Sequence, residues 1–303
     1  MRRPLTLVLA TLAPLAWAQP DWDAVEVEAT PVQGQVWLVE GAGGNIGVLA
    51  GEDGAVLVDD QYAPLTPKLQ AAVAELTGGP VRFVLNTHWH GDHTGGNENL
   101  GAAGAVIVAH HHVRERMSSE QFREFTQSTI PASPDGALPV VTFEDGVTLH
   151  VNGEPVTAYH LRHAHTDGDS IVHFEGSDVL HLGDVFFNQL YPFIDRSSGG
   201  SVQGMIAAVA FAETLCGAGT KVIPGHGPVT DCAGLAAYRA LLERSRDRVQ
   251  ALLDEGMSLE QVVAAKPTAD TDETWSWSFI GAEDFVTFVA QSLQAPPPST
   301  GRP

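Results

Sequence analysis

Four residues with metal-binding side chains lie within six consecutive positions of the 303-residue sequence. His88 and His90 follow an apolar segment, and Asp92 and His93 come directly after Gly91. In an extended chain His88 and His90 project to the same side, whereas a turn at Gly91 can direct Asp92 and His93 to a second point. Imidazole and carboxylate groups suit Zn²⁺, with Fe and Mn also possible. The cluster predicts a metal site at a strand end rather than a chance group of surface histidines.

Three later segments place the same kinds of side chain at the ends of short β-prone stretches. The stretches cover residues 156–161, 179–182 and 221–223, and the residues that follow them include His163, His165, Asp184 and His226. Loops held by a rigid scaffold commonly carry functional groups. The four segments together therefore predict one composite site.

The elements that must position these residues are short strands and helices. Strands are expected in β-prone segments between Gly-rich turns, at residues 25–29, 35–40, 45–50, 55–59, 81–85, 106–109, 147–151, 156–161, 170–174, 179–182 and 221–223. Helices are expected at 64–76, 112–119, 204–215, 235–255, 258–265 and 282–293, and a loop at 130–138. This order favours stacked sheets covered by helices in one α/β (α+β) domain.

Both ends of the chain differ in composition from the region between them. Residues 1–18 combine Arg2 and Arg3 with an apolar run and the pattern Ala16-Trp17-Ala18, which is typical of a secretory signal peptide. Residues 295–303 form a Pro-rich tail that is expected to be disordered. We therefore predict a signal peptide (1–18), one folded domain (19–294) and the tail (295–303). The mature bacterial protein is expected to be periplasmic or secreted, without a membrane anchor.

The charge balance restricts the partners of this chain. Its 16 Lys+Arg face 37 Asp+Glu, which gives a formal net charge of −21. Such a chain repels phosphate backbones and anionic lipid surfaces. We expect a small-molecule substrate and no nucleic acid partner.

The two cysteines, Cys216 and Cys232, lie 16 positions apart. An oxidising compartment permits a disulfide between them, and two separate buried thiols are the alternative. Neither cysteine has the spacing of a metal ligand.

Taken together, the motifs resemble those of the metallo-β-lactamase superfamily. The pattern H-x-H-x-D-H corresponds to His88, His90, Asp92 and His93, and the later motifs correspond to His165, Asp184 and His226. The resemblance extends in order over residues 25–293. It implies a four-layer αββα sandwich and a hydrolase with two zinc ions.

The resemblance also implies a role for each ligand. His88, His90 and His165 would hold one zinc ion, Asp92, His93 and His226 the second, and Asp184 would bridge them. A hydroxide between the metals would be the nucleophile, and catalytic Asp92 would orient it and relay its proton. Asp59 matches an acidic residue beneath the ligands that would orient a ligand imidazole, with a turn carboxylate as the alternative.

Export and a dinuclear site favour hydrolysis of β-lactam-type amide bonds outside the cytoplasm. One departure leaves other substrates open, because Asp184 stands where the best-studied true β-lactamases have Cys, and no nearby Lys follows it. The alternatives are a hydrolase of lactones, thioesters or sulfate or phosphate esters, and a non-hydrolytic iron- or metal-binding protein. The expected substrate wall consists of Trp89, Phe186, Asn188, Tyr191 and Arg196, with core packing as the alternative for the aromatic residues.

The remaining histidines receive structural interpretations. His110, His111 and His112 are expected to form a turn or helix start rather than a third metal site. His163 is expected at the wall or behind a ligand. The residues expected to be structural within strands are His150, His160, His173 and His181.

Overall fold

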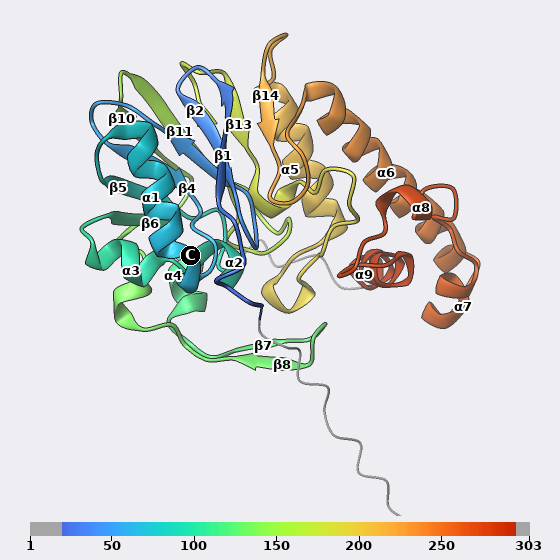
Figure 1. Ribbon diagram of the computed structural model, residues 1–303. Coiled ribbons are helices and arrows are strands. Elements are labelled where there is room, and N and C mark those ends of the chain that lie inside the picture. The colour runs from blue at the N-terminus through green and yellow to red at the C-terminus, as the bar shows by residue number, and fades with distance from the viewer. Residues whose placement is uncertain (1–19, 295–303) are drawn as a thin grey trace, which may run out of the picture.

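The computed structural model describes residues 20–294, so the predicted signal peptide and the predicted tail lie outside the described residues. Two β-sheets pack face to face, with helices on both outer faces (Figure 1). Within residues 20–294 every helix is too short or too polar to cross a lipid bilayer.

The first sheet has seven strands in the order β1-β2-β3-β4-β5-β6-β9. Its strands are β1 (Glu28–Gln33), β2 (Val36–Glu40), β3 (Ile46–Leu49), β4 (Ala55–Val58), β5 (Val81–Leu85), β6 (Val106–His110) and β9 (Val141–Phe143). Strands β1 to β4 pair antiparallel, whereas β4, β5, β6 and β9 pair parallel. The carboxyl ends of the parallel strands therefore meet at one edge, where the first ligand motif begins.

The second sheet has six strands in the order β10-β11-β12-β13-β14-β15. These are β10 (Gly146–Val151), β11 (Glu154–His160), β12 (Ser170–Phe174), β13 (Val179–His181), β14 (Lys221–Ile223) and β15 (Thr230–Asp231). The parallel pair β13–β14 brings the chain after β13 close to the chain after β14. These two chain segments carry Asp184 and His226.

Helices cover the sheets from both sides. They are α1 (Thr66–Thr77), α2 (Gly91–Thr94), α3 (Asn97–Ala102), α4 (His111–Met117), α5 (Val202–Thr214), α6 (Cys232–Asp254), α7 (Leu259–Ala264), α8 (Asp272–Trp275) and α9 (Ala282–Gln294). Leu69 and Val73 of α1 pack on the outer face of the first sheet, and α5, α6 and α9 cover the second sheet. A third core, which includes Val56, Val108 and Val172, fills the space between the sheets. Three apolar cores between four layers confirm the predicted αββα sandwich.

A two-stranded hairpin is the main element that the sequence did not predict. It consists of β7 (Gln121–Arg123) and β8 (Ser128–Ile130) and extends below the sheets in Figure 1. Its strands are short and largely polar, so they lack the apolar alternation that indicates a strand. Phe125 at its tip packs against Phe193, Phe279 and Phe288 and fixes the hairpin to the body of the protein.

Cys216 and Cys232 form a disulfide, which is the first of the two alternatives that the sequence left open. The bond joins the segment after α5 to the first residue of α6. Asp231 caps the same end of α6 by accepting hydrogen bonds from the backbone N–H groups of Ala233 and Gly234. This end of α6 is therefore held both covalently and by a side-chain cap.

Candidate metal centre

The predicted ligands come from four strand ends and converge between the two sheets. His88 and His90 lie in the loop after β5, and Asp92 and His93 lie in α2. The other three follow strands of the second sheet: His165 after β11, Asp184 after β13 and His226 after β14. Glycine makes the convergence possible, because a Cβ at Gly225 would collide with the carboxylate of Asp184.

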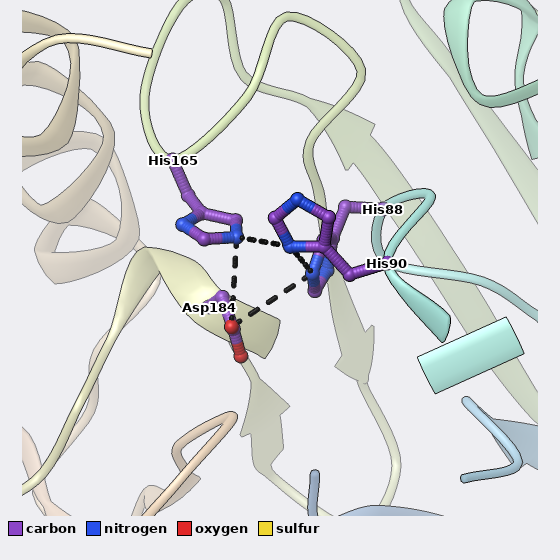
Figure 2. Close-up of side chains that lie close together, drawn as sticks. All are labelled: His88, His90, His165 and Asp184. Atoms are coloured by element: carbon purple, nitrogen blue, oxygen red, sulfur yellow. Dashed lines mark hydrogen bonds and ion pairs between the residues drawn. The ribbon is translucent and has the colours of Figure 1, made fainter. Parts of the chain in front are cut away.

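Three imidazoles and one carboxylate form the first ligand group (Figure 2). His90 Nδ1 lies 3.1 Å from His88 Nε2 and 2.9 Å from His165 Nε2. Asp184 Oδ2 lies 3.8 Å from His88 Nε2 and 3.5 Å from His165 Nε2. All four residues are buried.

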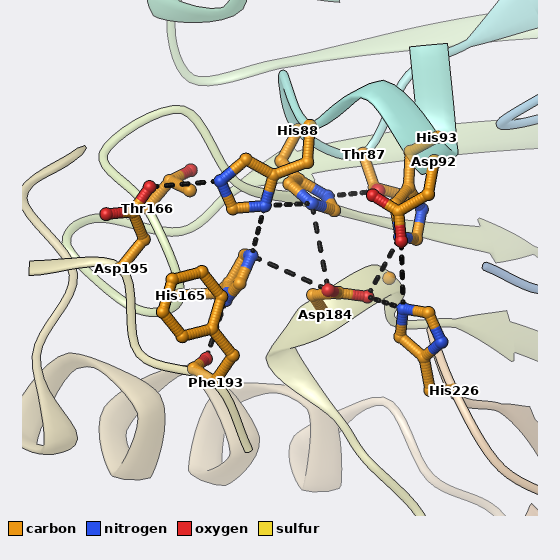
Figure 3. A network of polar contacts seen from close by, with 12 residues as sticks. Thr87, His88, Asp92, His93, His165, Thr166, Asp184, Phe193, Asp195 and His226 are labelled. Carbon is orange, nitrogen blue, oxygen red and sulfur yellow. Dashed lines mark hydrogen bonds and ion pairs between the residues drawn. The ribbon is translucent and has the colours of Figure 1, made fainter. Parts of the chain in front are cut away.

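Asp92, His93 and His226 form the second ligand group (Figure 3). Asp92 Oδ2 lies 3.6 Å from His93 Nε2 and 3.4 Å from His226 Nε2. Asp184 Oδ1 lies 3.1 Å and 3.5 Å from the same two nitrogens. Asp184 therefore directs one oxygen at each group, so the two groups are joined through a single carboxylate.

The outer nitrogens of the ligand imidazoles are held by hydrogen-bond acceptors. His93 Nδ1 donates to Asp59 Oδ2 at 2.8 Å, and His90 Nε2 donates to Asp195 Oδ2 at 3.0 Å. His165 Nδ1 donates to the carbonyl oxygen of Phe193 at 2.8 Å. Each contact leaves the inner nitrogen with a free lone pair directed at the centre, which is how proteins prepare histidines to bind a metal.

His88 is held in the same way through a hydroxyl group. Thr87 Oγ1 donates to Asp59 Oδ2 at 2.7 Å, so this hydroxyl accepts from His88 Nδ1 at 3.0 Å. Asp59, which is fully buried, thus orients His93 directly and His88 through Thr87. This arrangement is the position behind the ligands that the sequence predicts for Asp59.

The residues present fit a bound metal. With their outer nitrogens as donors, the inner nitrogens of His88, His90 and His165 face one another as acceptors, and within residues 20–294 no other donor forms a hydrogen bond with them. His93 Nε2 and Asp184 Oδ1 are buried and have no hydrogen-bond partner among the described residues. Buried polar atoms of this kind are normally satisfied, and a cation would satisfy all of them together. The His/Asp cluster can therefore bind metal ions.

Electrostatics at the second group favour a positive charge, which a bound metal ion would supply in place of the proton on His226. Burial lowers the pKa of His226, but Asp184 and Asp92 outweigh burial and raise this pKa to about 9. Burial lowers the pKa of His165 to about 4, with opposition from Asp184, so the first group presents a neutral imidazole. A neutral imidazole is the form that binds a metal.

A cavity of about 330 Å³ opens onto this centre. The ligands His90, Asp92, Asp184 and His226 lie at its base. The other residues that line it are Gly43, Tyr62, Arg123, Phe187, Phe193, Trp277 and Phe279. The wall is therefore mostly aromatic, as is common in sites for small molecules.

The five predicted wall residues lie elsewhere, and this prediction is corrected. Phe186 and Tyr191 are fully buried and pack on Tyr238 and Phe285, which is the core-packing alternative. The 3-10 turn Gly183–Val185 directs the side chain of Phe187, rather than that of Phe186, into the cavity.

The other three predicted wall residues are also not among the residues that line the cavity. Asn188 donates to the carbonyl oxygen of Pro228, and Arg196 lines a separate cavity. Trp89 is buried and donates from its indole N–H to Ser198 Oγ at 3.1 Å.

Sequence reasoning missed the residues that do line the cavity, and it also missed Asp195. Tyr62, Arg123, Trp277 and Phe279 lie in segments without a ligand motif. For Asp195 a local signal exists, because it precedes Ser197 and Ser198 and accepts hydrogen bonds from both, as the residue before a helical turn commonly does.

The remaining histidines lie outside this centre. His110 ends β6 and caps α4, and His111 and His112 begin α4, in line with the predicted turn or helix start; the ring nitrogens of the three residues lie close together. His110 stacks on His160, with ring centroids 3.6 Å apart and an interplanar angle of 4°. His163 bonds to the carbonyl oxygen of Gly199 rather than lining the cavity.

Comparisons with known proteins agree with this architecture. The sequence profile of the Metallo-beta-lactamase superfamily matches residues 30–226. A hydroxyacylglutathione hydrolase from Polaromonas sp. is 39% identical over 178 residues, which cover 58% of this chain and 58% of the relative. The chain spans about half to two thirds of the length of the curated relatives it matches.

Two solved structures share the fold. A metallo-beta-lactamase from Pontibacter korlensis superposes with a TM-score of 0.59 at 21% identity and covers 72% of this chain and 99% of that chain. A mutant of a sec-alkyl sulfatase superposes with a TM-score of 0.66 at 17% identity and covers 88% of this chain and 50% of that chain. At these identities the likeness shows the fold alone.

Proposed function

Because this chain belongs to the metallo-β-lactamase superfamily, we propose that it is an exported hydrolase that uses two zinc ions to cleave the amide bond of β-lactam-type small molecules. The observation that carries this proposal is the position of Asp184. Its Oδ2 lies 3.5 Å from His165 Nε2 in one ligand group, and its Oδ1 lies 3.1 Å from His93 Nε2 in the other. A carboxylate in this position is suited to bridging two ions.

The two ligand groups define which residues would hold each ion. His88, His90 and His165 would hold one, Asp92, His93 and His226 would hold the other, and Asp184 would contact both. When bound, zinc supplies Lewis acidity, which acidifies water and polarises a carbonyl group near neutral pH.

Asp92 is the residue of the chain best placed to accept the proton of the attacking water. Its side chain is 24% exposed and lines the cavity, whereas that of Asp184 is 6% exposed. Burial acts to raise the pKa of Asp92, but His93 and His226 outweigh it and hold this pKa well below its usual range. Asp92 therefore remains a carboxylate, as a proton acceptor must.

Export is supported by two features of the chain. Residues 1–18 have the composition of a signal peptide. The disulfide between Cys216 and Cys232 is of a kind that persists in oxidising compartments such as the bacterial periplasm.

Thioester hydrolysis is the second candidate function. It is favoured by an aspartate, rather than a cysteine, at position 184 and by the similarity to a relative named hydroxyacylglutathione hydrolase. Both candidate functions use the same metal centre and differ in the bond that is cleaved there, which is an amide in the first and a thioester in the second.

The proposal is tested with protein comprising residues 19–303, stripped of metal and reloaded with zinc. We expect about two zinc ions per chain by elemental analysis, in line with two ligand groups. We expect turnover of a chromogenic cephalosporin that a chelator abolishes and added zinc restores. Loss of turnover in Asp92→Asn with zinc retained would assign the proton acceptor.

A substrate panel separates the two candidates. Penicillins, cephalosporins and carbapenems form one arm, and lactones and acyl thioesters form the other. Turnover only in the second arm replaces the β-lactam assignment with ester or thioester hydrolysis. Bound zinc without turnover in either arm refutes the hydrolase proposal.

A further inference from the structure

Arg123, the last residue of β7, brings a positive charge to the cavity above the metal centre. Among the described residues that line this cavity it is the single Lys or Arg. It belongs to the hairpin rather than to either sheet, and the hairpin is the arm that extends below the sheets in Figure 1. The position of this cation is therefore set by an element separate from those that carry the ligands.

Among the described residues, the guanidinium group of Arg123 has no carboxylate partner. Within residues 20–294 no carboxylate lies within ion-pair distance of it, and its Nε is buried without a hydrogen-bond partner. Arg116, on the adjacent helix α4, is fully paired with Asp167 through two hydrogen bonds of 2.7 Å. A partly buried arginine that lacks such a partner retains unused donors, and a bound anion would satisfy them.

Trp89 holds this cation in place. The guanidinium carbon of Arg123 lies 5.6 Å from the centre of the Trp89 ring, in a cation–π arrangement. The indole N–H donates to Ser198 Oγ, which donates to Asp195 Oδ2 at 2.6 Å, and Asp195 accepts from the ligand His90. A continuous chain of contacts therefore fixes Arg123 relative to the metal centre.

The rest of the cavity fits a ligand that is apolar apart from its anionic group. Phe187, Phe193, Trp277 and Phe279 supply aromatic walls. The Tyr62 ring also lines the cavity, and a phenol is neutral near pH 7. Tyr62 therefore remains a neutral hydrogen-bond donor beside Arg123.

We propose that Arg123 binds a carboxylate group of the substrate while the scissile bond lies at the metal centre and the apolar part of the substrate contacts the aromatic walls. This inference rests on the proposed function, because it assumes that the cavity holds a substrate for the metal centre. The shared chemistry is an oxyanion with at least two acceptor oxygens, which the guanidinium fork binds with two parallel hydrogen bonds. Sulfate and phosphate groups have the same chemistry, so the test includes them.

The first experiment compares two substrates that differ only in the negative charge of the carboxylate group. The zinc-loaded protein is assayed with a chromogenic cephalosporin as the free acid and as its methyl ester. In Arg123→Gln we expect KM for the acid to rise about 10-fold or more, which is the value of a charge-assisted contact, while KM for the ester and kcat for both change little. Arg123→Lys should recover part of the loss, because it restores the charge without the fork.

A matched control tests whether the effect belongs to this arginine. Arg82 is exposed and also lies over an aromatic ring, 5.8 Å from the centre of Phe83, but it does not line the cavity. Arg82→Gln should leave the acid-to-ester ratio of KM unchanged. Equal changes for acid and ester in Arg123→Gln would mean that Arg123 only supports the hairpin, and they would overturn the inference.

The second experiment decides the inference even if no substrate is hydrolysed. Binding of phenylacetate, benzylsulfonate, benzylphosphonate and neutral phenylacetamide to the zinc-loaded protein is measured by calorimetry. We expect Arg123→Gln to weaken phenylacetate about 10-fold and to leave phenylacetamide unchanged.

The calorimetric arms also separate the classes of anion. If Arg123→Gln weakens binding of the sulfonate or the phosphonate but not of phenylacetate, the group that Arg123 binds is a sulfate or phosphate rather than a carboxylate. No selective loss for any anion overturns the subsite. Absence of turnover alone counts against the proposed function, and this result is distinguishable because the calorimetric preference is measured independently.

Discussion

At the scale of single residues, the carboxylate of Asp184 is shared by two ligand groups that otherwise have no residue in common. Its two oxygens face imidazoles from both sheets, and Gly225 leaves room for it because any larger side chain there would meet it. Loss of one of these oxygens therefore affects both groups, whereas loss of the outer carboxylate of Asp195 affects only the imidazole of His90 that it orients.

Replacing Asp184 with Asn should reduce zinc content at both positions. The amide keeps the shape but removes the negative charge and one acceptor oxygen, so the affinity should fall by more than the roughly 10–100-fold expected for an outer residue. Zinc affinity is measured by competition with a chromophoric chelator. Asp145→Asn is the control, because the Asp145 side chain is 96% exposed and its replacement should leave the zinc affinity unchanged.

The two outer carboxylates should act differently on the two ligand groups. Asp195→Asn disturbs His90 alone and should weaken mainly one of the two zinc-binding steps by about 10–100-fold. Asp59→Asn disturbs His93 directly and His88 through Thr87, so it should weaken both steps. The same chelator competition, read as two steps, checks this result. Equal weakening of both steps in Asp195→Asn would contradict the orientation of His90 alone by this carboxylate.

The first four ligands were predictable because their spacing is local, and the other three were assigned through the resemblance to a known family, whereas the wall was not predictable. His88, His90, Asp92 and His93 stand together in six positions, and a strand precedes them. The wall instead combines the hairpin with a segment near Trp277, more than 150 positions away along the chain. Periodicity in one segment carries no information about such a distant pairing.

At the scale of elements, the ends of β6 and β11 join the two sheets through a pair of stacked histidines. His110 closes β6 and His160 closes β11, and their rings lie 3.6 Å apart. Burial and the neighbouring histidine lower the pKa of His110 to about 2, and burial lowers that of His160 to about 4. The pair is therefore neutral in the folded protein at neutral pH.

These lowered pKa values predict a loss of stability in acid. In the unfolded chain both residues take up protons near pH 6.5, above their folded pKa values. The unfolded state thus binds more protons, and stability that is fully present above pH 6.5 is lost progressively as the pH falls from about 6.5 to about 2. The double variant His110→Asn with His160→Gln should lose less stability over this range, as measured by urea unfolding.

An exposed strand histidine supplies the control for this titration. His150→Gln on β10 should follow the wild-type pH dependence. If the double variant also follows it, the stacked pair does not contribute to acid sensitivity.

Strands with strong β-prone runs were predicted within a few residues, whereas weakly patterned elements were not. The segment 81–85 matches β5, and the helix expected at 258–265 corresponds to α7, which Ser258 caps. The strands β7 and β8 have only three residues each, and they form because Phe125 and the hairpin turn hold them against the body of the protein. Such tertiary support leaves no local signal in the sequence.

At the scale of the whole molecule, four layers enclose three apolar cores and the centre lies where strand ends of both sheets meet. The disulfide adds a covalent link on the outer side of the second sheet. It closes a loop with a sequence separation of 16 residues between α5 and α6.

Removing the disulfide should destabilise the protein by about 3 kcal/mol, since a closed loop of this length restricts the unfolded chain. The variant Cys216→Ser with Cys232→Ser is compared with the oxidised wild type by chemical denaturation. Reductant should destabilise the wild type to a similar extent and leave the double variant unchanged. A variant as stable as the oxidised protein would show that the link adds nothing.

The wall of the cavity has a consequence for how this chain could acquire new substrates. Trp277 and Phe279 lie beyond residue 226, where the family match ends, and Arg123 lies on a hairpin that holds no ligand. We expect substitutions at these positions to alter the selectivity of the cavity, because none of the three residues belongs to the ligand groups. Reactivity and selectivity would then be separately mutable, and a library restricted to these three positions would be a direct route to retargeting the protein by directed evolution.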